Sequence, residues 1–225
     1  MTLTTISPGL ENVVAASTRL SSVDGLAGEL IIAGYALEEL AENATAEETI
    51  FLLWQDRLPS ADELTDFRRR LASLRSLPPV TLDLLRAAAR AGAPVMDALR
   101  MAAGTLSLDL PQSDDPWAEA MALTARFPVI VASYWRLLHG DEPIAPDAEL
   151  GHAANFLYML TGQAPSQGQV RGLETYLNSV SDHGFNASTF AARVIIATGT
   201  DLTSAIVGAV GALKGPLHGG APGPA

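Results

Sequence analysis

The sequence has 225 residues, of which 48% are apolar and 17% charged, and this composition excludes intrinsic disorder. Cysteine is absent, which excludes disulfides, thiolate nucleophiles and zinc–thiolate sites. The net charge of −11 disfavours a nucleic-acid partner, and no apolar run approaches the roughly 20 residues that a membrane span requires. Because residues 1–8 also lack a secretory signal pattern, we expect a cytoplasmic protein that binds neither nucleic acid nor membrane.

The first 35 residues differ in pattern from the rest of the chain. Gly, Ser and Val are frequent there, Val23-Asp24-Gly25 is typical of a turn, and Leu30-Ile31-Ile32 predicts a short strand. Beyond this segment apolar residues recur at helical spacing, and no alternating strand pattern appears. We therefore predict a mostly α chain, with an N-terminal segment carrying a short β element (residues 1–35) and a helical portion (residues 36–225).

Local signals place the helices of this second portion. Thr45 is expected to form a capping box with Glu48, and Ser60 and Asp201 are expected to cap later helices. Pro128 should kink or split the helix that contains it, because proline lacks the amide proton and crowds the preceding turn. The run Arg68-Arg69-Arg70 is interpreted as a solvated face. Helices are expected over residues 36–42, 45–58, 60–74, 81–91, 95–107, 116–138, 146–160, 166–181, 187–197 and 201–213.

The candidate chemical groups are histidines. His139 precedes a glycine at a helix end, where an imidazole commonly caps the last carbonyls. His183 lies between two helix ends, where the N-terminal dipole of the next helix favours a neutral imidazole that can donate a hydrogen bond to a carbonyl. His218 lies in a glycine-rich loop that leaves backbone amides open to a ligand. For His183 and His218 a purely structural turn or cap remains the alternative at this point.

Five segments of the chain, taken in order, resemble the citrate synthase family. The two most specific of them surround His183 and His218. The segments are Val23-Asp24-Gly25-Leu26-Ala27-Gly28-Glu29-Leu30, Gly34-Tyr35 with Glu39-Leu40-Ala41, Asn155-Phe156-Leu157-Tyr158-Met159-Leu160, Asp182-His183-Gly184-Phe185-Asn186-Ala187-Ser188-Thr189 and Leu213-Lys214-Gly215-Pro216-Leu217-His218-Gly219-Gly220-Ala221. The resemblance implies the large helical domain of the citrate synthase fold, with a small β element near the N-terminus, and a homodimer.

The resemblance also implies a reaction and its partners. The family condenses acetyl-CoA with oxaloacetate to give citrate and CoA, with a coenzyme A thioester as co-substrate, no permanently bound cofactor and no metal. His183 would then stabilise the enolate of the thioester, and His218 would donate to the ketone oxygen of oxaloacetate. The other implied contacts are His152, Asn155, Asn186 and Gly219 with substrate, and Lys214, Gly215, Pro216, Leu217 and Gly220 with coenzyme A. For His152 a partly buried structural residue is the alternative.

Departures from the family pattern leave other functions open. Ala33 stands where the family often has an arginine, and Pro222 replaces a common asparagine after the second histidine motif. A 2-methylcitrate synthase that uses propionyl-CoA carries the same two motifs, and a helical assembly subunit without catalysis is a further alternative. The family's catalytic aspartate lies well downstream of the second motif. We therefore expect residues 1–225 to be a partial synthase sequence with little activity alone and with exposed apolar helix faces.

Overall fold

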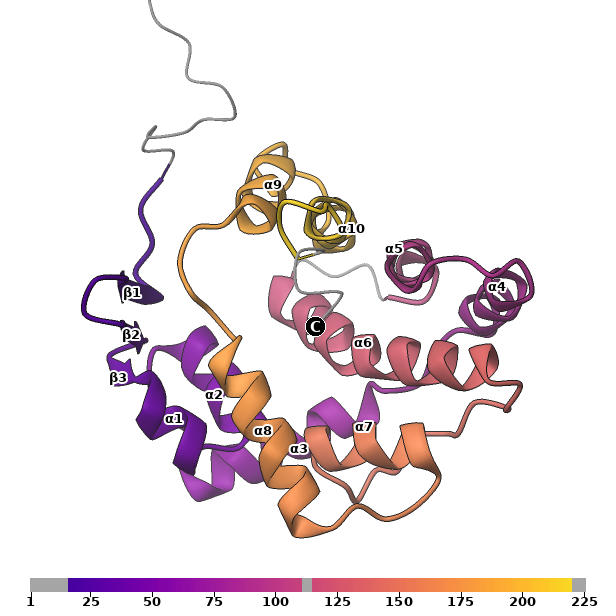
Figure 1. The fold of residues 1–225 in the computed structure, drawn as a ribbon, viewed down its shortest axis with the longest axis horizontal. Coiled ribbons are helices and arrows are strands. Elements are labelled where there is room, and N and C mark those ends of the chain that lie inside the picture. Colours follow the sequence, from indigo (N-terminus) through magenta and orange to yellow (C-terminus); the bar gives the residue numbers. More distant parts are fainter. Residues whose placement is uncertain (1–15, 111–114, 220–225) are drawn as a thin grey trace, which may run out of the picture.

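The computed structural model describes residues 16–110 and 115–219, and most of them are helical (Figure 1). This confirms the predicted mostly α fold with a small β element near the N-terminus. Among the described residues, no helix combines the length and apolarity needed to cross a membrane. The elements in chain order are β1 (Ser21–Asp24), β2 (Glu29–Ile32), β3 (Tyr35–Ala36), α1 (Leu37–Asn43), α2 (Ala46–Gln55), α3 (Ala61–Ser73), α4 (Pro79–Arg90), α5 (Val95–Thr105), the 3-10 turn η2 (Leu106–Leu108), α6 (Pro116–Leu138), α7 (His152–Thr161), α8 (Gln167–Ser179), α9 (Ala187–Ile196) and α10 (Leu202–Leu213).

The β element is an antiparallel sheet with the strand order β1-β2-β3. Its first turn is fixed locally, because the Asp24 carboxylate accepts hydrogen bonds from the backbone N–H groups of Leu26 and Ala27. Ile32 on β2 is fully buried and packs with Leu40 of α1 and with Leu52. The predicted strand at residues 30–32 is confirmed, and its one buried side chain attaches the sheet to the helices.

The long helix α6 is the centre of the helical portion. It packs against α3, α4, α5, α7 and α10 (Figure 1). Ile130 and Tyr134 are almost fully buried in the largest apolar cluster, and the Tyr134 hydroxyl donates to the Ala93 carbonyl at 2.5 Å. The predicted bounds of α6 are confirmed, and the helix continues through Pro128 without being split. The capping box at Thr45 and the cap at Ser60 are also confirmed, and Ser60 forms a box with Glu63 in addition.

The helix expected from residue 146 begins only at His152. The Arg75 side chain, which is 2% exposed, donates to the carbonyls of Asp147 and Leu150 at 2.7 and 2.9 Å. The backbone N–H of Asp147 in turn donates to Asn155 Oδ1 at 2.8 Å. These bonds hold the segment before α7 in a loop with a turn at residues 148–149. The prediction of an early helix start is wrong because a distant arginine takes carbonyls that a helix would use.

Of the arginines expected on a solvated face, Arg68 is only partly solvated, with 42% of its side chain exposed. Its Nε atom lies 3.6 Å from Glu47 Oε1, and the Glu47 side chain is only 2% exposed. Arg69 does behave as expected, since its pair with Asp66 is exposed on both sides. Arg68 therefore provides the positive charge next to a buried carboxylate, which costs far less than burying that carboxylate alone.

Helices α9 and α10 pack closely because α10 carries glycine at the contact (Figure 1). A Cβ atom built on Gly208 would lie 2.1 Å from Ile195 Cδ1, so a larger residue needs Ile195 to move. The start of α10 is fixed by two carboxylates. The predicted cap Asp201 accepts from the Ser204 N–H, and Glu119 of α6 accepts from the N–H of Thr203 at 2.9 Å. This packing positions the ends of α9 and α10, where two of the histidine segments lie.

Helix α8 is attached to α1 through the last carbonyls of α1. Asn178 donates to the carbonyls of Leu40 and Ala44 at 3.1 and 2.8 Å. The Thr175 hydroxyl donates to the Ala41 carbonyl at 3.0 Å, and Arg171 donates to the same carbonyl. The Leu40 carbonyl also accepts from the Ala44 backbone N–H at 3.0 Å, whereas the carbonyls beyond it follow the last donor of a helix that ends at residue 43. Side chains of α8 therefore complete the C-terminal end of α1.

Candidate functional site

The segments around His183 and His218 come together at the start of α9. His183 lies in the loop between α8 and α9, and His218 follows the end of α10. His218 Nε2 lies 2.9 Å from the hydroxyl of Ser188, the second residue of α9. Because α9 and α10 pack side by side, two motifs that are 30 residues apart share one hydrogen bond.

Asn186 belongs to the same group of residues. It is the N-cap of α9, and its Oδ1 accepts from the Thr189 backbone N–H at 2.9 Å. The Ser188 hydroxyl donates to the same Oδ1 at 2.7 Å. Thus Asn186 reaches His218 through Ser188, for which the sequence predicted no contact with a histidine. A serine two positions after the N-cap can hydrogen-bond the cap side chain, so the contact between Ser188 and Asn186 could have been predicted from the sequence. The contact between Ser188 and His218 could not, because it depends on tertiary packing.

His183 lies in a loop that is fixed by its neighbour Asp182. The Asp182 carboxylate accepts from the backbone N–H of Gly184 at 3.1 Å and from the hydroxyl of Ser21 on β1. Gly184 has a φ of +101°, a conformation that residues with a side chain rarely adopt. The His183 side chain is exposed, and within the described residues its imidazole forms no hydrogen bond. The loop is therefore held by its backbone and by Asp182, while the imidazole is available to a ligand.

The loop after α10 is a tight turn. The His218 backbone N–H donates to the Gly215 carbonyl at 3.0 Å, and Leu217 is fully exposed between them. Gly219 lies against the end of α10, where an added Cβ would be 2.4 Å from Leu213 Cδ1, so only glycine fits without movement. Gly220 lies outside the described residues. The turn keeps the His218 ring close to α9.

Two further members of the predicted coenzyme A contact precede His218 in the same loop. Pro216 is exposed, and Lys214 pairs with Asp97 of α5. This pairing lowers the pKa of Asp97 through the lysine hydrogen bond. The Lys214 side chain is thereby held next to α5 and not next to α9. Pro216 and Leu217 of the same turn are exposed to solvent.

His152 and Asn155 belong to a separate, buried cluster. The His152 backbone N–H donates to Glu47 Oε1 at 2.8 Å, and burial lowers the pKa of its imidazole, with the nearby Arg75 charge acting in the same direction. Asn155 is 2% exposed, and its amide bonds the Asp147 N–H and contacts the Met159 sulfur. These contacts hold the start of α7 in place. Neither His152 nor Asn155 belongs to the hydrogen-bonded group around His218.

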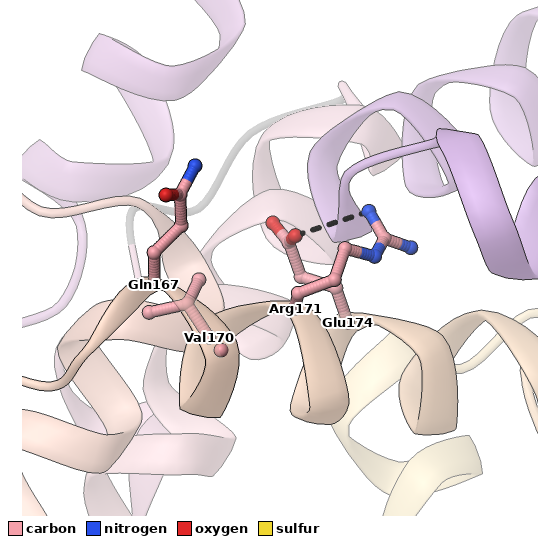
Figure 2. A pocket seen from close by; sticks show the side chains of 5 residues that line it. Gln167, Val170, Arg171 and Glu174 are labelled. Atoms are coloured by element: carbon pink, nitrogen blue, oxygen red, sulfur yellow. Dashed lines mark hydrogen bonds and ion pairs between the residues drawn. The ribbon is translucent and has the colours of Figure 1, made fainter.

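A hollow of about 590 Å³ lies along the first turns of α8, away from the histidine motifs in sequence (Figure 2). Its lining includes Arg171 and Glu174, which form an ion pair at 3.3 Å across one helical turn. Burial raises the pKa of Glu174, and Arg171 opposes that shift. Since Arg171 is also bonded to carbonyls of α1, this hollow has the features of a structural contact and contains none of the predicted site residues. Nowhere in the described residues do three His, Asp or Glu side chains gather as metal ligands.

Comparison with known proteins identifies the family. Residues 9–225 match the family described as citrate synthase, C-terminal domain. The chain is 41% identical over 221 residues to a citrate synthase from Haloferax volcanii, and the match covers 95% of this chain and 58% of that protein. It is equally identical, over 219 residues, to a 2-methylcitrate synthase from Mycobacterium tuberculosis, where the match covers 96% of this chain and 56% of that protein.

A solved structure agrees with this result. The ternary complex of citrate synthase from Thermoplasma acidophilum with carboxymethyl coenzyme A and oxaloacetate superposes with a TM-score of 0.88 at 28% identity. The match covers 96% of this chain and 58% of that one. The chain therefore spans somewhat more than half the length of the relatives that it matches. By sequence and by fold, the chain belongs to the citrate synthase family.

Proposed function

We propose that this chain contributes to a condensing enzyme that joins the methyl carbon of acetyl-CoA, which is the α-carbon of the thioester, to the ketone carbon of oxaloacetate and then hydrolyses the thioester to give citrate and CoA. The observation that carries the proposal is the placement of the His218 turn against the start of the helix that follows His183. The condensation requires the thioester and the ketone to lie side by side, and the meeting of the two histidine motifs at the start of α9 supports this arrangement.

Each histidine has a role in this proposal. The exposed His183 imidazole hydrogen-bonds the thioester oxygen and stabilises the enol or enolate that forms when the α-proton passes to a base, the aspartate that the family resemblance places downstream of the second histidine motif. His218 donates to the ketone oxygen of oxaloacetate as that oxygen gains negative charge. No metal or permanently bound cofactor has a part in these steps.

The remaining contacts follow from the loop geometry. The exposed turn of residues 214–219, with Lys214, Gly215, Pro216 and Leu217, is proposed to receive coenzyme A together with Gly220. His152, Asn155, Asn186 and Gly219 are proposed on the oxaloacetate side. For Asn155 and Asn186 the contacts already described make this role indirect, through the backbone that each of them holds.

The same proposal includes the setting of the enzyme. We propose a cytoplasmic homodimer, with residues 36–225 forming part of the large helical domain and residues 1–35 forming a separate N-terminal segment. The ternary complex of the Thermoplasma acidophilum relative with carboxymethyl coenzyme A and oxaloacetate supports the choice of ligands. A second candidate is 2-methylcitrate synthesis from propionyl-CoA, which the equal identity to the Mycobacterium tuberculosis protein favours.

A thiol-release assay tests the function and separates the two candidates. Residues 1–225 are assayed alone and joined to the remainder of the Haloferax volcanii relative, with oxaloacetate and either acetyl-CoA or propionyl-CoA. The thioester with the higher kcat/KM identifies the acyl substrate. Absence of thiol release in both proteins with both thioesters would contradict the proposal and favour a non-catalytic assembly subunit.

Substitutions in the active protein test the site. His183→Ala and His218→Ala should each lower kcat by roughly several hundredfold, because each removes a preorganised donor. His139→Ala is the matched control, since that imidazole bonds the Trp135 carbonyl of its own helix at 2.7 Å and should leave kcat unchanged. Equal losses in His139→Ala and His218→Ala would contradict the assigned roles.

A further inference from the structure

Strand β1 lies against the loop that carries His183. Residues two apart in a strand point to the same side of a sheet, so Ser21 and Val23 share one face of β1. The Ser21 hydroxyl donates to the Asp182 carboxylate, and a Cβ atom built on Gly184 would lie 4.0 Å from Val23 Cγ2. The connection from α8 to α9 therefore passes beside this face of β1, although the two bonded residues are 161 positions apart in the sequence (Figure 1).

Strand β1 contributes little to the apolar core. None of its four residues is buried, and in the order β1-β2-β3 it lies at the edge of the sheet. The sheet is attached to the helices by Ile32 of β2, which is fully buried. Burial of apolar side chains therefore does not explain why β1 lies against the loop, whereas the hydrogen bond of Ser21 does.

The chain just before β1 is attached to the same region by a second contact. Arg193 of α9 donates to the Ser17 carbonyl at 3.3 Å, and its guanidinium carbon lies 5.0 Å from the centre of the Phe185 ring. Phe185 in turn packs edge to face against Phe190 of α9, with 5.8 Å between the ring centres. The N-terminal segment therefore meets the loop and the helix after it at a point that is independent of β1 itself.

We propose that Ser21 is a positioning residue for His183. Asp182 directly precedes the histidine, and its carboxylate also accepts from the Gly184 N–H at 3.1 Å, so this carboxylate closes the backbone around His183. The Ser21 hydroxyl holds the same carboxylate from outside the loop and so fixes the place from which the exposed imidazole reaches a ligand. The catalytic meaning of this role rests on the proposed function, in which His183 donates to the thioester oxygen.

The bond between Ser21 and Asp182 acts on both of the segments that it joins. It breaks when either the loop or β1 moves away, so its loss raises the local opening of each segment by the same factor. A hydrogen bond to a charged acceptor changes such an equilibrium by roughly tenfold or more. Removal of the serine hydroxyl should therefore loosen the loop, and removal of the carboxylate should loosen β1.

Hydrogen exchange of residues 1–225, followed by mass spectrometry, measures the opening of both segments without substrate. Ser21→Ala should speed exchange by roughly tenfold in peptides that cover residues 181–186 and in peptides that cover β1, with no change at the buried centre of α6. Ser21→Thr keeps the hydroxyl and should retain the native rates. Ser22→Ala is the matched control, because Ser22 lies on the opposite face of the same strand. Native exchange rates in Ser21→Ala would overturn the proposal.

Asp182→Ala tests whether the two residues act through one bond. In β1 this variant should speed exchange as much as Ser21→Ala does. In the loop its effect should be larger, because the Gly184 N–H also loses its acceptor. In the Asp182→Ala background, Ser21→Ala should have no further effect on either segment. Additive effects of the two substitutions would overturn the bond as the cause, including the case in which Ser21→Ala disturbs the wider fold.

Kinetics of the active protein, in which residues 1–225 are joined to the remainder of the Haloferax volcanii relative, test the positioning of His183. A displaced donor that acts in the transition state lowers kcat and leaves KM nearly unchanged. We expect Ser21→Ala to lower kcat by roughly tenfold, Ser21→Thr to restore it and Ser22→Ala to leave it unchanged. An unchanged kcat in Ser21→Ala, despite faster exchange in the loop, would reject the positioning role.

The two experiments fail separately. The exchange measurement contains no substrate, so its result on the attachment of the loop stands even if the thiol-release assay shows no activity. Conversely, an active enzyme whose Ser21→Ala variant exchanges like the native chain would retain the condensing function and reject the role of Ser21.

Discussion

Replacing Gly208 by alanine adds one methyl group at the contact between α9 and α10. Two effects then oppose each other. Alanine in a helix interior is more favourable than glycine by about 1 kcal/mol. The new Cβ, however, would lie 2.1 Å from Ile195 Cδ1, and overpacking of this kind costs about 1–3 kcal/mol. The clash involves the far end of a side chain, so we expect Gly208→Ala to be destabilising by about 0–2 kcal/mol.

Gly211 provides a matched control on the same helix. A Cβ built there would lie 3.7 Å from Arg100 Cδ, which is an ordinary van der Waals distance. Gly211→Ala should therefore be stabilising by about 0.5–1 kcal/mol, with no packing cost. The difference between the two variants measures the packing term at the α9–α10 contact.

Ile195→Val tests the cause directly, because it removes the Cδ1 atom that the new methyl group would meet. In the Ile195→Val background, Gly208→Ala should become stabilising by about 1 kcal/mol. The assay is urea unfolding of residues 1–225 followed by circular dichroism, and the four proteins form a double-mutant cycle. If Gly208→Ala changes the free energy of unfolding equally in both backgrounds, the close contact does not control helix packing and the reasoning fails.

Two further predictions concern the buried cluster at the start of α7. Glu47→Ala should lower the free energy of unfolding by about 3 kcal/mol, because it leaves the His152 N–H without its acceptor and Arg68 without its counter-charge. Asp66→Ala, in an exposed pair, should cost about 0–1 kcal/mol, and urea unfolding measures both variants. Burial lowers the pKa of His152 below 6.5, so the unfolded chain binds a proton that the folded chain does not, and stability is lost as the pH falls below 6.5. His152→Gln should reduce the difference in unfolding free energy between pH 7.5 and about 5.5, and an unchanged difference in that variant would contradict this account.

Local signals predicted the helices well wherever the partner groups lie nearby in sequence. The Thr45 box needs only a glutamate three residues later, and α6 has a proline at its start and a histidine at its end. The errors arose where the partner is distant. Arg75 holds the loop before α7 by donating hydrogen bonds to two carbonyls that follow it by 72 and 75 residues. Nothing in the local pattern around residue 146 could have indicated that.

In the candidate site, too, local features could be predicted from the sequence and distant contacts could not. The motif around His183 identified the segment, and the N-cap role of Asn186 was readable from its position before a helix. The contact between Ser188 and His218 was not readable, because it depends on how α9 and α10 pack. Residue type and spacing therefore indicated which segments carry the chemistry, and tertiary structure decided which atoms within them meet.

The dependence of α1 on α8 has a consequence for the order of folding during synthesis. The side chains that complete α1 follow its carbonyls by 127 to 138 residues, as Arg171 and Asn178 show. A ribosome that adds about 5–20 residues per second needs roughly 6–28 s to supply them. A seven-residue helix is too short to persist alone during that time. The carbonyls at the end of α1 therefore lack these donors until α8 has been made, whereas Leu40 can pack on Ile32 and Leu52 much earlier.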